Sequence, residues 1–277
     1  MKKVILLIVI VFFLAGAYLV FMNRVRMRDN FYLWYRRNTL PKEQEYVPTG
    51  ETGNKNESPT STINKTQKTA LGFKKEVTVT STSFKNDILL AEINLAVPFV
   101  SQAPLGNWDA VHEETCEEAS ALMLNGFYKK EKYTRQQMED ELQRIIAWEK
   151  DNLGFFEDTT AEETARFMQE IYNLKAVVVY DVTIEDIKKE LAAGHPVIIP
   201  AAGKVLPNPY FSNGGPVYHM LVLKGYTKDG KFISNDPGTN TLGENFTYKF
   251  NDLYNAIHDW VKDGDILTGR KAMIVVR

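Results

Sequence analysis

Cysteine is nearly absent from this sequence of 277 residues, in which Cys116 is the only one. A single thiol excludes an intrachain disulfide, so cysteine content indicates nothing about the redox compartment. Histidine is also scarce, with four residues. The sequence has no HExxH motif, no clustered Cys/His set, no spaced oxygen ligands of a calcium loop and no P-loop. We therefore expect neither a metal nor a cofactor.

A large excess of charge of either sign is missing as well. Lys and Arg number 33, Asp and Glu number 35, and the net charge is −2. This balance gives no electrostatic reason to expect nucleic-acid binding. Hydrophobic residues make up 44% of the chain, enough for a globular protein with a substantial core.

One long hydrophobic run is present, from Val4 to Met22, with basic residues on both sides. At ~1.5 Å per residue it spans roughly 28 Å, enough to cross a bilayer core. A cleaved signal peptide is the main alternative, but the small residues Ala15–Ala17 lie inside the run rather than after it. We expect residues 1–23 to be an uncleaved, single-pass transmembrane anchor.

Residues 24–87 are expected to form a flexible polar tether. From about Pro41 to Ser83 the chain is rich in Thr, Ser, Asn, Lys and Glu, and it has too few apolar residues to form a core. The topology signals disagree. Five arginines between Arg24 and Arg37 favour a cytoplasmic C-terminal part. The polar tether is typical of anchored extracytoplasmic enzymes, and we expect the domain to face outward.

The stretch from Val97 to Tyr128 brings the only thiol to the expected start of a helix. Apolar and small residues follow Cys116 at three- and four-residue steps, the spacing of one buried helix face. A helix N-terminus favours a reactive thiolate. Four glutamates oppose this effect: Glu113, Glu114, Glu117 and Glu118. Cys116 is therefore either a nucleophile that needs a cationic partner or a small core residue.

The rest of residues 88–277 shows helices first and strands later, the order of an α+β domain. Capping patterns predict helices after Thr134, after Thr159 or Thr160, and after Thr183. A further helix is expected at 251–260. Strands are expected within 88–100 and at 176–180, 195–199, 217–226, 231–236 and 272–276.

His219 is the histidine best suited to partner Cys116, because it lies on a predicted strand on the same face as Leu221 and Leu223. His112, four residues before the thiol, ranks second. His195 and His258 are expected to be structural or solvent-facing.

Asp236 is the predicted partner of His219. If residues 227–230 form a four-residue hairpin loop, Tyr226 pairs with Lys231, and Asp236 is a diagonal neighbour of His219. With a two-residue loop, Asp236 lies directly opposite. Either register lets the carboxylate reach the imidazole. A nucleophile, a base and an orienting carboxylate are what nucleophilic catalysis needs, although the sequence from Asn235 to Gly238 also suits a simple turn.

Four segments in this order resemble a known family: SQAPLGNW, CEEASALM, YHMLVLKGY and FISNDPG. They are similar to the papain-fold cysteine peptidases related to the bacteriocin double-glycine leader peptidases (cysteine peptidase family thirty-nine-like). The resemblance runs from about Val97 to the C-terminus. It implies an α+β papain-like fold, in which N-terminal helices, including the nucleophile helix, pack on a C-terminal antiparallel sheet.

The resemblance implies Cys116 as nucleophile, His219 as general base and acid, and Asp236 as orienting residue. It also implies that the Gln102 side-chain amide, with the N–H of Cys116, donates to the oxyanion. Trp108 and the loop 206–216 are candidates to line a peptide cleft. This chain has Glu-Glu where the transporter-linked members have Gly-Pro after the cysteine, and no ATP-binding cassette follows. The double-glycine leader substrate is therefore not expected here.

The leading hypothesis is a membrane-anchored cysteine peptidase that hydrolyses peptide bonds through a thioester acyl-enzyme. Its expected partners are a peptide or protein substrate and the membrane, without nucleic acid. One alternative is a cell-wall amidase or endopeptidase of the same superfamily. Another is a non-catalytic peptide-binding module.

Overall fold

The structure, a computed structural model, describes residues 2–45, 90–240 and 242–277. Most of the expected tether and its boundary with the domain lie outside these residues. Helix α1 (Lys2–Thr39) continues well beyond the expected end of the anchor. Within the described chain, its stretch Ile10–Thr39 is long and apolar enough, by length and composition, to cross a membrane.

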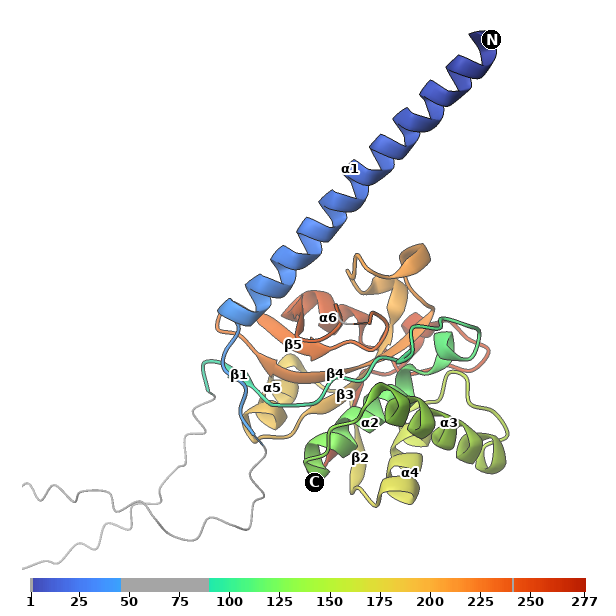
Figure 1. Ribbon diagram of the computed structural model, residues 1–277. Coiled ribbons are helices and arrows are strands. Elements are labelled where there is room, and N and C mark those ends of the chain that lie inside the picture. The colour runs from blue at the N-terminus through green and yellow to red at the C-terminus, as the bar shows by residue number, and fades with distance from the viewer. Residues whose placement is uncertain (1, 46–89, 241) are drawn as a thin grey trace, which may run out of the picture. The chain divides into compact units, whose positions relative to one another are not determined.

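The core of the domain is a mixed helix and sheet structure with an antiparallel sheet of seven strands (Figure 1). The strand order is β2-β7-β3-β4-β5-β6, and β1 pairs with the C-terminal end of β4, at Gly225 and Tyr226. The bounds are β1 Ile93–Asn94, β2 Ala176–Tyr180, β3 Val197–Ala202, β4 Tyr218–Tyr226, β5 Lys231–Asn235, β6 Phe246–Lys249 and β7 Ala272–Val276. All nine residues of β4 are buried, as expected for a strand covered on both faces.

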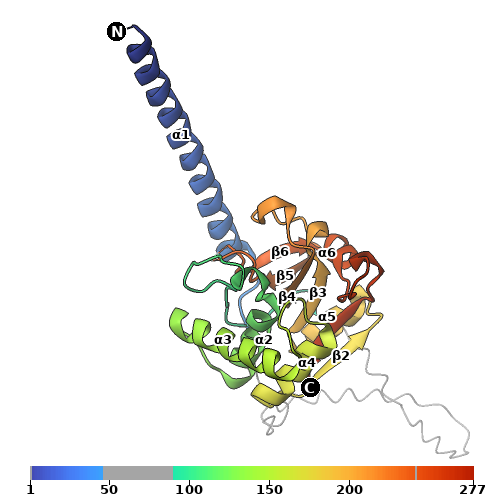
Figure 2. The same cartoon turned by 90° about the vertical axis from the view of Figure 1, so that its right-hand side faces the viewer.

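Helices α2, α3 and α4 lie together on one side of the sheet (Figure 2). The bounds of the domain helices are α2 Cys116–Lys129, α3 Arg135–Asn152, α4 Ala161–Tyr172, α5 Ile184–Ala192 and α6 Phe250–Ala256. Capping boxes start α3, α4 and α5 at Thr134, Thr160 and Thr183, which confirms the predicted starts. Every residue of α2 from Cys116 to Phe127 is buried, so α2 is the central helix. The predicted α+β fold is confirmed.

Three element predictions were wrong in detail. Of the expected strand at 88–100, residues 88 and 89 lie outside the described residues, and the rest forms only β1. The close approach of β1 to β4 requires Gly225, because a Cβ there would lie 2.1 Å from the Ile93 carbonyl oxygen. Helix α6 ends at Ala256, since Ile257 bridges to Ala201 of β3. Strand β6 was missed, although its buried Phe246 and Tyr248 alternate with more exposed residues, as period-two geometry predicts.

The hairpin of β4 and β5 combines a predicted register with an unpredicted bulge. Val222 lies opposite Asn235, as the four-residue loop requires. At the loop, however, Tyr226 lies opposite Phe232 rather than Lys231. An irregularity between Leu223 and Gly225 absorbs the extra residue, as a β-bulge does. The diagonal placement of Asp236 relative to His219 therefore survives a different turn.

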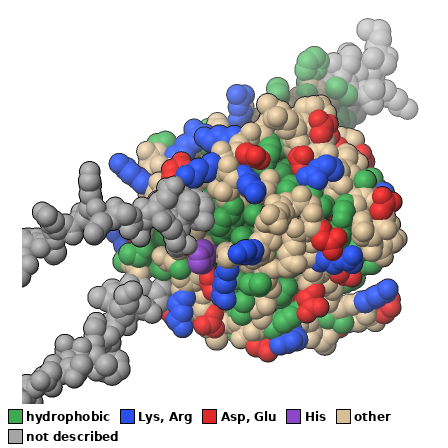
Figure 3. Space-filling model, turned by 90° about the horizontal axis from the view of Figure 1, so that it is seen from below, with side chains coloured by type: hydrophobic (Ala, Val, Ile, Leu, Met, Phe, Trp, Pro, Cys, Tyr) green, Lys and Arg blue, Asp and Glu red, His purple; other side chains and the backbone are tan. Residues whose placement is uncertain are grey.

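Charge is dispersed on the face of the molecule that Figure 3 shows. Lys and Arg side chains alternate there with Asp and Glu, and hydrophobic side chains lie between them. This distribution fits the near-zero net charge of the sequence.

Candidate active site

Cys116 is the first residue of α2 and packs against β4. Its N-cap, Thr115, donates its hydroxyl to the Gln102 carbonyl oxygen at 2.9 Å, which fixes the helix start to the preceding loop. The thiol is 5% exposed. Its Sγ donates to Glu117 Oε2 at 3.0 Å and accepts the backbone N–H of Met220 at 3.3 Å. The nucleophile candidate therefore contacts the residue that follows His219.

Burial and negative charge raise the pKa of the Cys116 thiol well above its usual value. Burial is the largest cause, followed by the charge and hydrogen bond of Glu117, and the N–H of Met220 opposes them only in part. Burial also raises the pKa of Glu117 itself, and Glu118 adds to the rise. Burial, together with the acidic neighbours, thus outweighs the helix N-terminus, and the resting side chain is a thiol.

His219 and Asp236 form a buried pair. The His219 Nε2 atom lies 2.9 Å from Asp236 Oδ1, and the two residues are 1% and 0% exposed. An ionised carboxylate accepts a hydrogen from Nε2 and so leaves Nδ1 as the free acceptor of the imidazole. The ring of Phe211 packs edge-on against His219, with 5.2 Å between centroids. These contacts fix both the tautomer and the orientation of the imidazole.

Asp236 is held by donors that sequence reasoning missed. Tyr248 donates its hydroxyl to Oδ2 at 2.6 Å, Asn208 donates its amide to Oδ2 at 3.0 Å, and the N–H of Gly238 donates to Oδ1 at 3.0 Å. Burial alone would raise the pKa of Asp236, but the charge and hydrogen bond of His219, with the bonds from Tyr248 and Gly238, lower it. The carboxylate is therefore ionised next to His219.

Gly238 is required where it stands. A Cβ at this position would lie 3.0 Å from His219 Cε1 and 2.9 Å from a ring carbon of Phe211. Asn235 ends β5, and the turn at Pro237 and Gly238 that follows brings Gly238 next to the histidine. The alternation of aromatic and polar residues at Phe246–Lys249 is the sequence signal that could have pointed to Tyr248, and nothing in the sequence pointed to Asn208.

Gln102 lies beside the helix start, 4% exposed. Its Nε2 donates to the carbonyl oxygens of His112 and Glu113, at 2.8 and 3.1 Å. Its Oε1 has no hydrogen-bond partner among the described residues. The structure thus places Gln102 near the cysteine helix but engages its amide with the loop carbonyls.

The other histidines have partners of their own. His112 lies between two carboxylates, with Nδ1 2.7 Å from Asp109 and Nε2 3.0 Å from Glu139. His195 pairs with Glu190, and His258 Nδ1 donates to the Gly269 carbonyl oxygen. His112, the second-ranked base, therefore has both ring nitrogens engaged away from Cys116.

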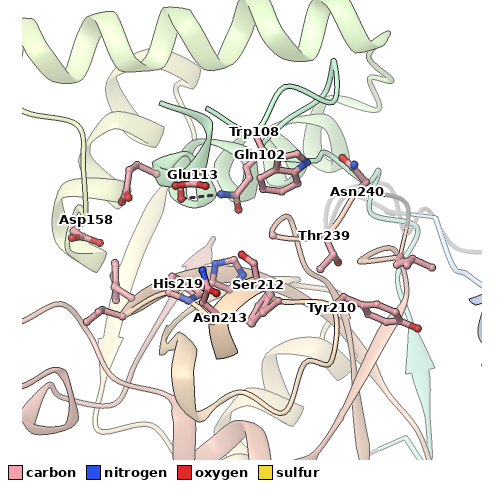
Figure 4. A pocket seen from close by; sticks show the side chains of 18 residues that line it. Gln102, Trp108, Glu113, Asp158, Tyr210, Ser212, Asn213, His219, Thr239 and Asn240 are labelled. Atoms are coloured by element: carbon pink, nitrogen blue, oxygen red, sulfur yellow. Dashed lines mark hydrogen bonds between the residues drawn. The ribbon is translucent and has the colours of Figure 1, made fainter. Parts of the chain in front are cut away.

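A cavity of about 800 Å³ lies beside His219 (Figure 4). Gln102, Trp108, residues 210–213 and residues 215–217 line it, so Trp108 and much of the predicted loop border one pocket. Cys116 is buried and is not among the side chains that line this cavity. Among the described residues, no group of three or more His, Cys, Asp or Glu side chains could hold a metal ion.

Comparison with known proteins identifies the family. Several solved structures resemble the chain, among them the following two. One is a Bacillus anthracis protein described as a C39-like peptidase, with 19% identity, 67% of this chain and 98% of that chain covered, and a TM-score of 0.42. The other is the cysteine protease interpain A of Prevotella intermedia, with 17% identity, coverage of 55% and 62%, and a TM-score of 0.30. No curated protein matches the sequence. The model of the Peptidase_C39 like family matches residues 94–265, more than half of the chain, and the chain therefore belongs to this family of peptidases.

Proposed function

We propose that this chain is a membrane-anchored cysteine peptidase that uses Cys116, His219 and Asp236. The observation that carries the proposal is the contact between Cys116 Sγ and the backbone of β4 next to His219, whose imidazole is bonded to the buried Asp236. A thiol, a base with a fixed tautomer and an ionised carboxylate are the groups that acyl transfer requires.

In the proposed reaction, His219 Nδ1 takes the thiol proton as Cys116 Sγ attacks the scissile carbonyl carbon. The C–N bond then breaks, and the imidazolium gives its proton to the leaving amine. Water, deprotonated by the same imidazole, attacks the thioester, and the proton returns to the departing sulfur. The first step requires the thiol hydrogen to turn from Glu117 to the imidazole, since the resting bond is to the carboxylate.

Gln102 is the proposed donor to the oxyanion, together with the N–H of Cys116. The carbonyls of His112 and Glu113 belong to consecutive residues of a short 3-10 helix, so one amide hydrogen can serve both as a three-centre bond. The second hydrogen of Nε2 is then free for the oxyanion. A donor of this kind contributes about 10²–10³ in kcat.

The membrane part of the proposal rests on α1. Its described apolar residues from Ile10 to Met22 are exposed, as suits a segment that contacts lipid rather than protein. We propose that this segment anchors the enzyme by a single pass and that the domain faces outward. Protease digestion of the tether in intact cells tests the topology, and digestion only after rupture of the membrane contradicts it.

A non-catalytic peptide-binding module is the second candidate, and one observation favours it. The thiol of Cys116 is buried, donates a hydrogen bond to Glu117 and has a raised pKa, and all three features oppose nucleophilic attack. A module of this kind would bind peptides in the same pocket without turnover.

The test uses the full chain in detergent with a peptide library and purified cell wall. The peptidase proposal expects peptide cleavage by the wild type and losses of at least about 10³-fold in Cys116→Ala and His219→Gln. Retained turnover in Cys116→Ala contradicts it. Peptide binding without turnover by the wild type supports the module. Cleavage of cell wall alone supports the amidase or endopeptidase.

A further inference from the structure

Three carboxylates gather on one side of the pocket that borders His219. Glu113, Glu114 and Asp158 all line it, and no Lys or Arg is among the lining residues. In Figure 4, Glu113 and Asp158 lie on the side away from Tyr210, Thr239 and Asn240. Within the described chain, none of the three carboxylates forms an ion pair with a basic side chain. Among the described residues, this acidic side therefore has no counterion.

The carboxylates on this acidic side of the pocket repel one another. Burial raises the pKa of Glu114, and the charges of Asp158, Glu157 and Glu113 add to the rise. Burial and the charge of Glu157 likewise raise the pKa of Asp158. Like charges that are partly removed from water repel more strongly than at an exposed surface. A cation bound among them would relieve that repulsion.

A second observation at the same place points to a donor ligand. Gln102 lines the pocket, is 4% exposed, and carries an Oε1 atom without a hydrogen-bond partner among the described residues. Figure 4 shows this oxygen turned from the Glu113 contact toward the pocket space above His219. A buried acceptor that lacks a donor is costly, and a ligand N–H can supply the missing bond. The three carboxylates and the unpartnered Gln102 oxygen can only accept hydrogen bonds. A ligand group that only donates hydrogen bonds would therefore suit them all.

From these observations we infer that the pocket selects substrates with a positively charged group, an ammonium or a guanidinium, which binds among Glu113, Glu114 and Asp158. The inference rests on the proposed peptidase function and names its substrate class. The cavity of about 800 Å³ can take a lysine or arginine side chain together with the adjoining backbone. Trp108, which is 38% exposed on the pocket wall, offers an aromatic face of the kind that cations favour.

The first experiment measures kcat/KM of the full-length enzyme on matched peptides. At each position in turn, Lys or Arg is compared with Gln and with Glu, and each peptide is made with a free or an acetylated N-terminus. We expect a preference of roughly tenfold for the cationic peptides, which weakens as salt is added. The position scan distinguishes a side-chain cation from a terminal amino group. Equal rates for the Lys, Gln and Glu peptides, or a preference for Glu, would overturn the inference.

The second experiment removes the carboxylates without changing their shape. Glu114→Gln, Asp158→Asn and the double variant should lower the Lys-to-Gln ratio of kcat/KM stepwise toward one. Glu170→Gln on the exposed side of α4 is the matched control and should keep the wild-type ratio. An undiminished ratio in both single variants would contradict the assignment.

The third experiment separates this inference from the proposed function. Binding of the same peptides to Cys116→Ala is measured by calorimetry, which requires no catalysis. Tighter binding of cationic peptides supports the inference even if the wild type hydrolyses nothing, an outcome in which the peptidase proposal alone fails. Hydrolysis without any charge preference retains the peptidase and overturns the inference.

Discussion

The Cys116 thiol lies 3.0 Å from the Glu117 carboxylate, to which it donates its hydrogen. This neighbour restrains the nucleophile, because a thiolate formed beside an ionised carboxylate is destabilised by repulsion. In the proposed mechanism the activating group is therefore His219, which precedes Met220, the residue whose backbone N–H contacts the sulfur.

Glu117→Gln should make the thiol easier to ionise. The substitution removes a charge that raises the pKa of Cys116, so the midpoint of iodoacetamide alkylation against pH should fall. Below the midpoint, alkylation should be faster in the variant than in the wild type. Glu185→Gln on α5, an exposed helix site, is the control. An unchanged midpoint would show that Glu117 does not restrain the thiol.

Tyr248→Phe should weaken the hold on Asp236. The pKa of Asp236 is lowered in the folded state, so its stabilising contribution is present above its unfolded pKa and is lost as the pH falls through the folded value. Loss of the Tyr248 hydrogen bond raises the folded pKa, and acid unfolding should begin at a higher pH. Unfolding by denaturant between about pH 3 and pH 6 checks this. Tyr254→Phe on α6 is the matched control and should follow the wild type.

Glu149→Gln should stabilise the protein in alkaline solution. Burial raises the pKa of Glu149 on α3 to about 8. Burial also raises the pKa of Glu118 on α2, the carboxyl that contacts Glu149. A carboxyl with a raised folded pKa stabilises below its unfolded pKa and loses that contribution as the pH rises to about 8. The variant should therefore gain up to roughly 5 kcal/mol relative to wild type above this pH. Glu170→Gln should gain nothing, and a parallel decline of the wild type and Glu149→Gln would refute the assignment.

His112→Gln should remove a stabilisation that depends on pH. Burial lowers the pKa of His112, but the hydrogen bonds and charges of Asp109 and Glu139 outweigh it and raise the pKa. The ion pairs of His112 with Asp109 and Glu139 stabilise the protein fully below the unfolded pKa of His112. This stabilisation is lost as the pH rises through the folded pKa. The difference in Tm between wild type and variant should be larger at about pH 6 than at about pH 9. Gln136→Ala, an exposed substitution on α3 that removes no titratable group, should show no such trend.

The sequence was sufficient to predict which elements carry the candidate site residues. It was not sufficient to predict the contacts that set the charge and orientation of these residues. Helical spacing put Cys116 at the start of α2, and period-two geometry put Asp236 near His219, because both follow from local backbone repeats. The contact of Asn208 with Asp236 and that of Glu139 with His112 join residues far apart in the chain, and the hydrogen bond of the thiol to Glu117 depends on side-chain rotamers. No local repeat encodes these contacts. The bulge between Leu223 and Gly225 shows the same limit within a single hairpin.

The most direct test of the account follows covalent labelling of Cys116 by a peptidyl vinyl sulfone, using intact mass and peptide mapping on the full chain. We predict a single adduct on Cys116 in the wild type and labelling at least about 10²-fold slower in His219→Gln. After unfolding, iodoacetamide should label the thiol of both proteins equally. Labelling of native His219→Gln at the wild-type rate, or no adduct on native wild-type Cys116, would contradict the catalytic pairing of Cys116 with His219.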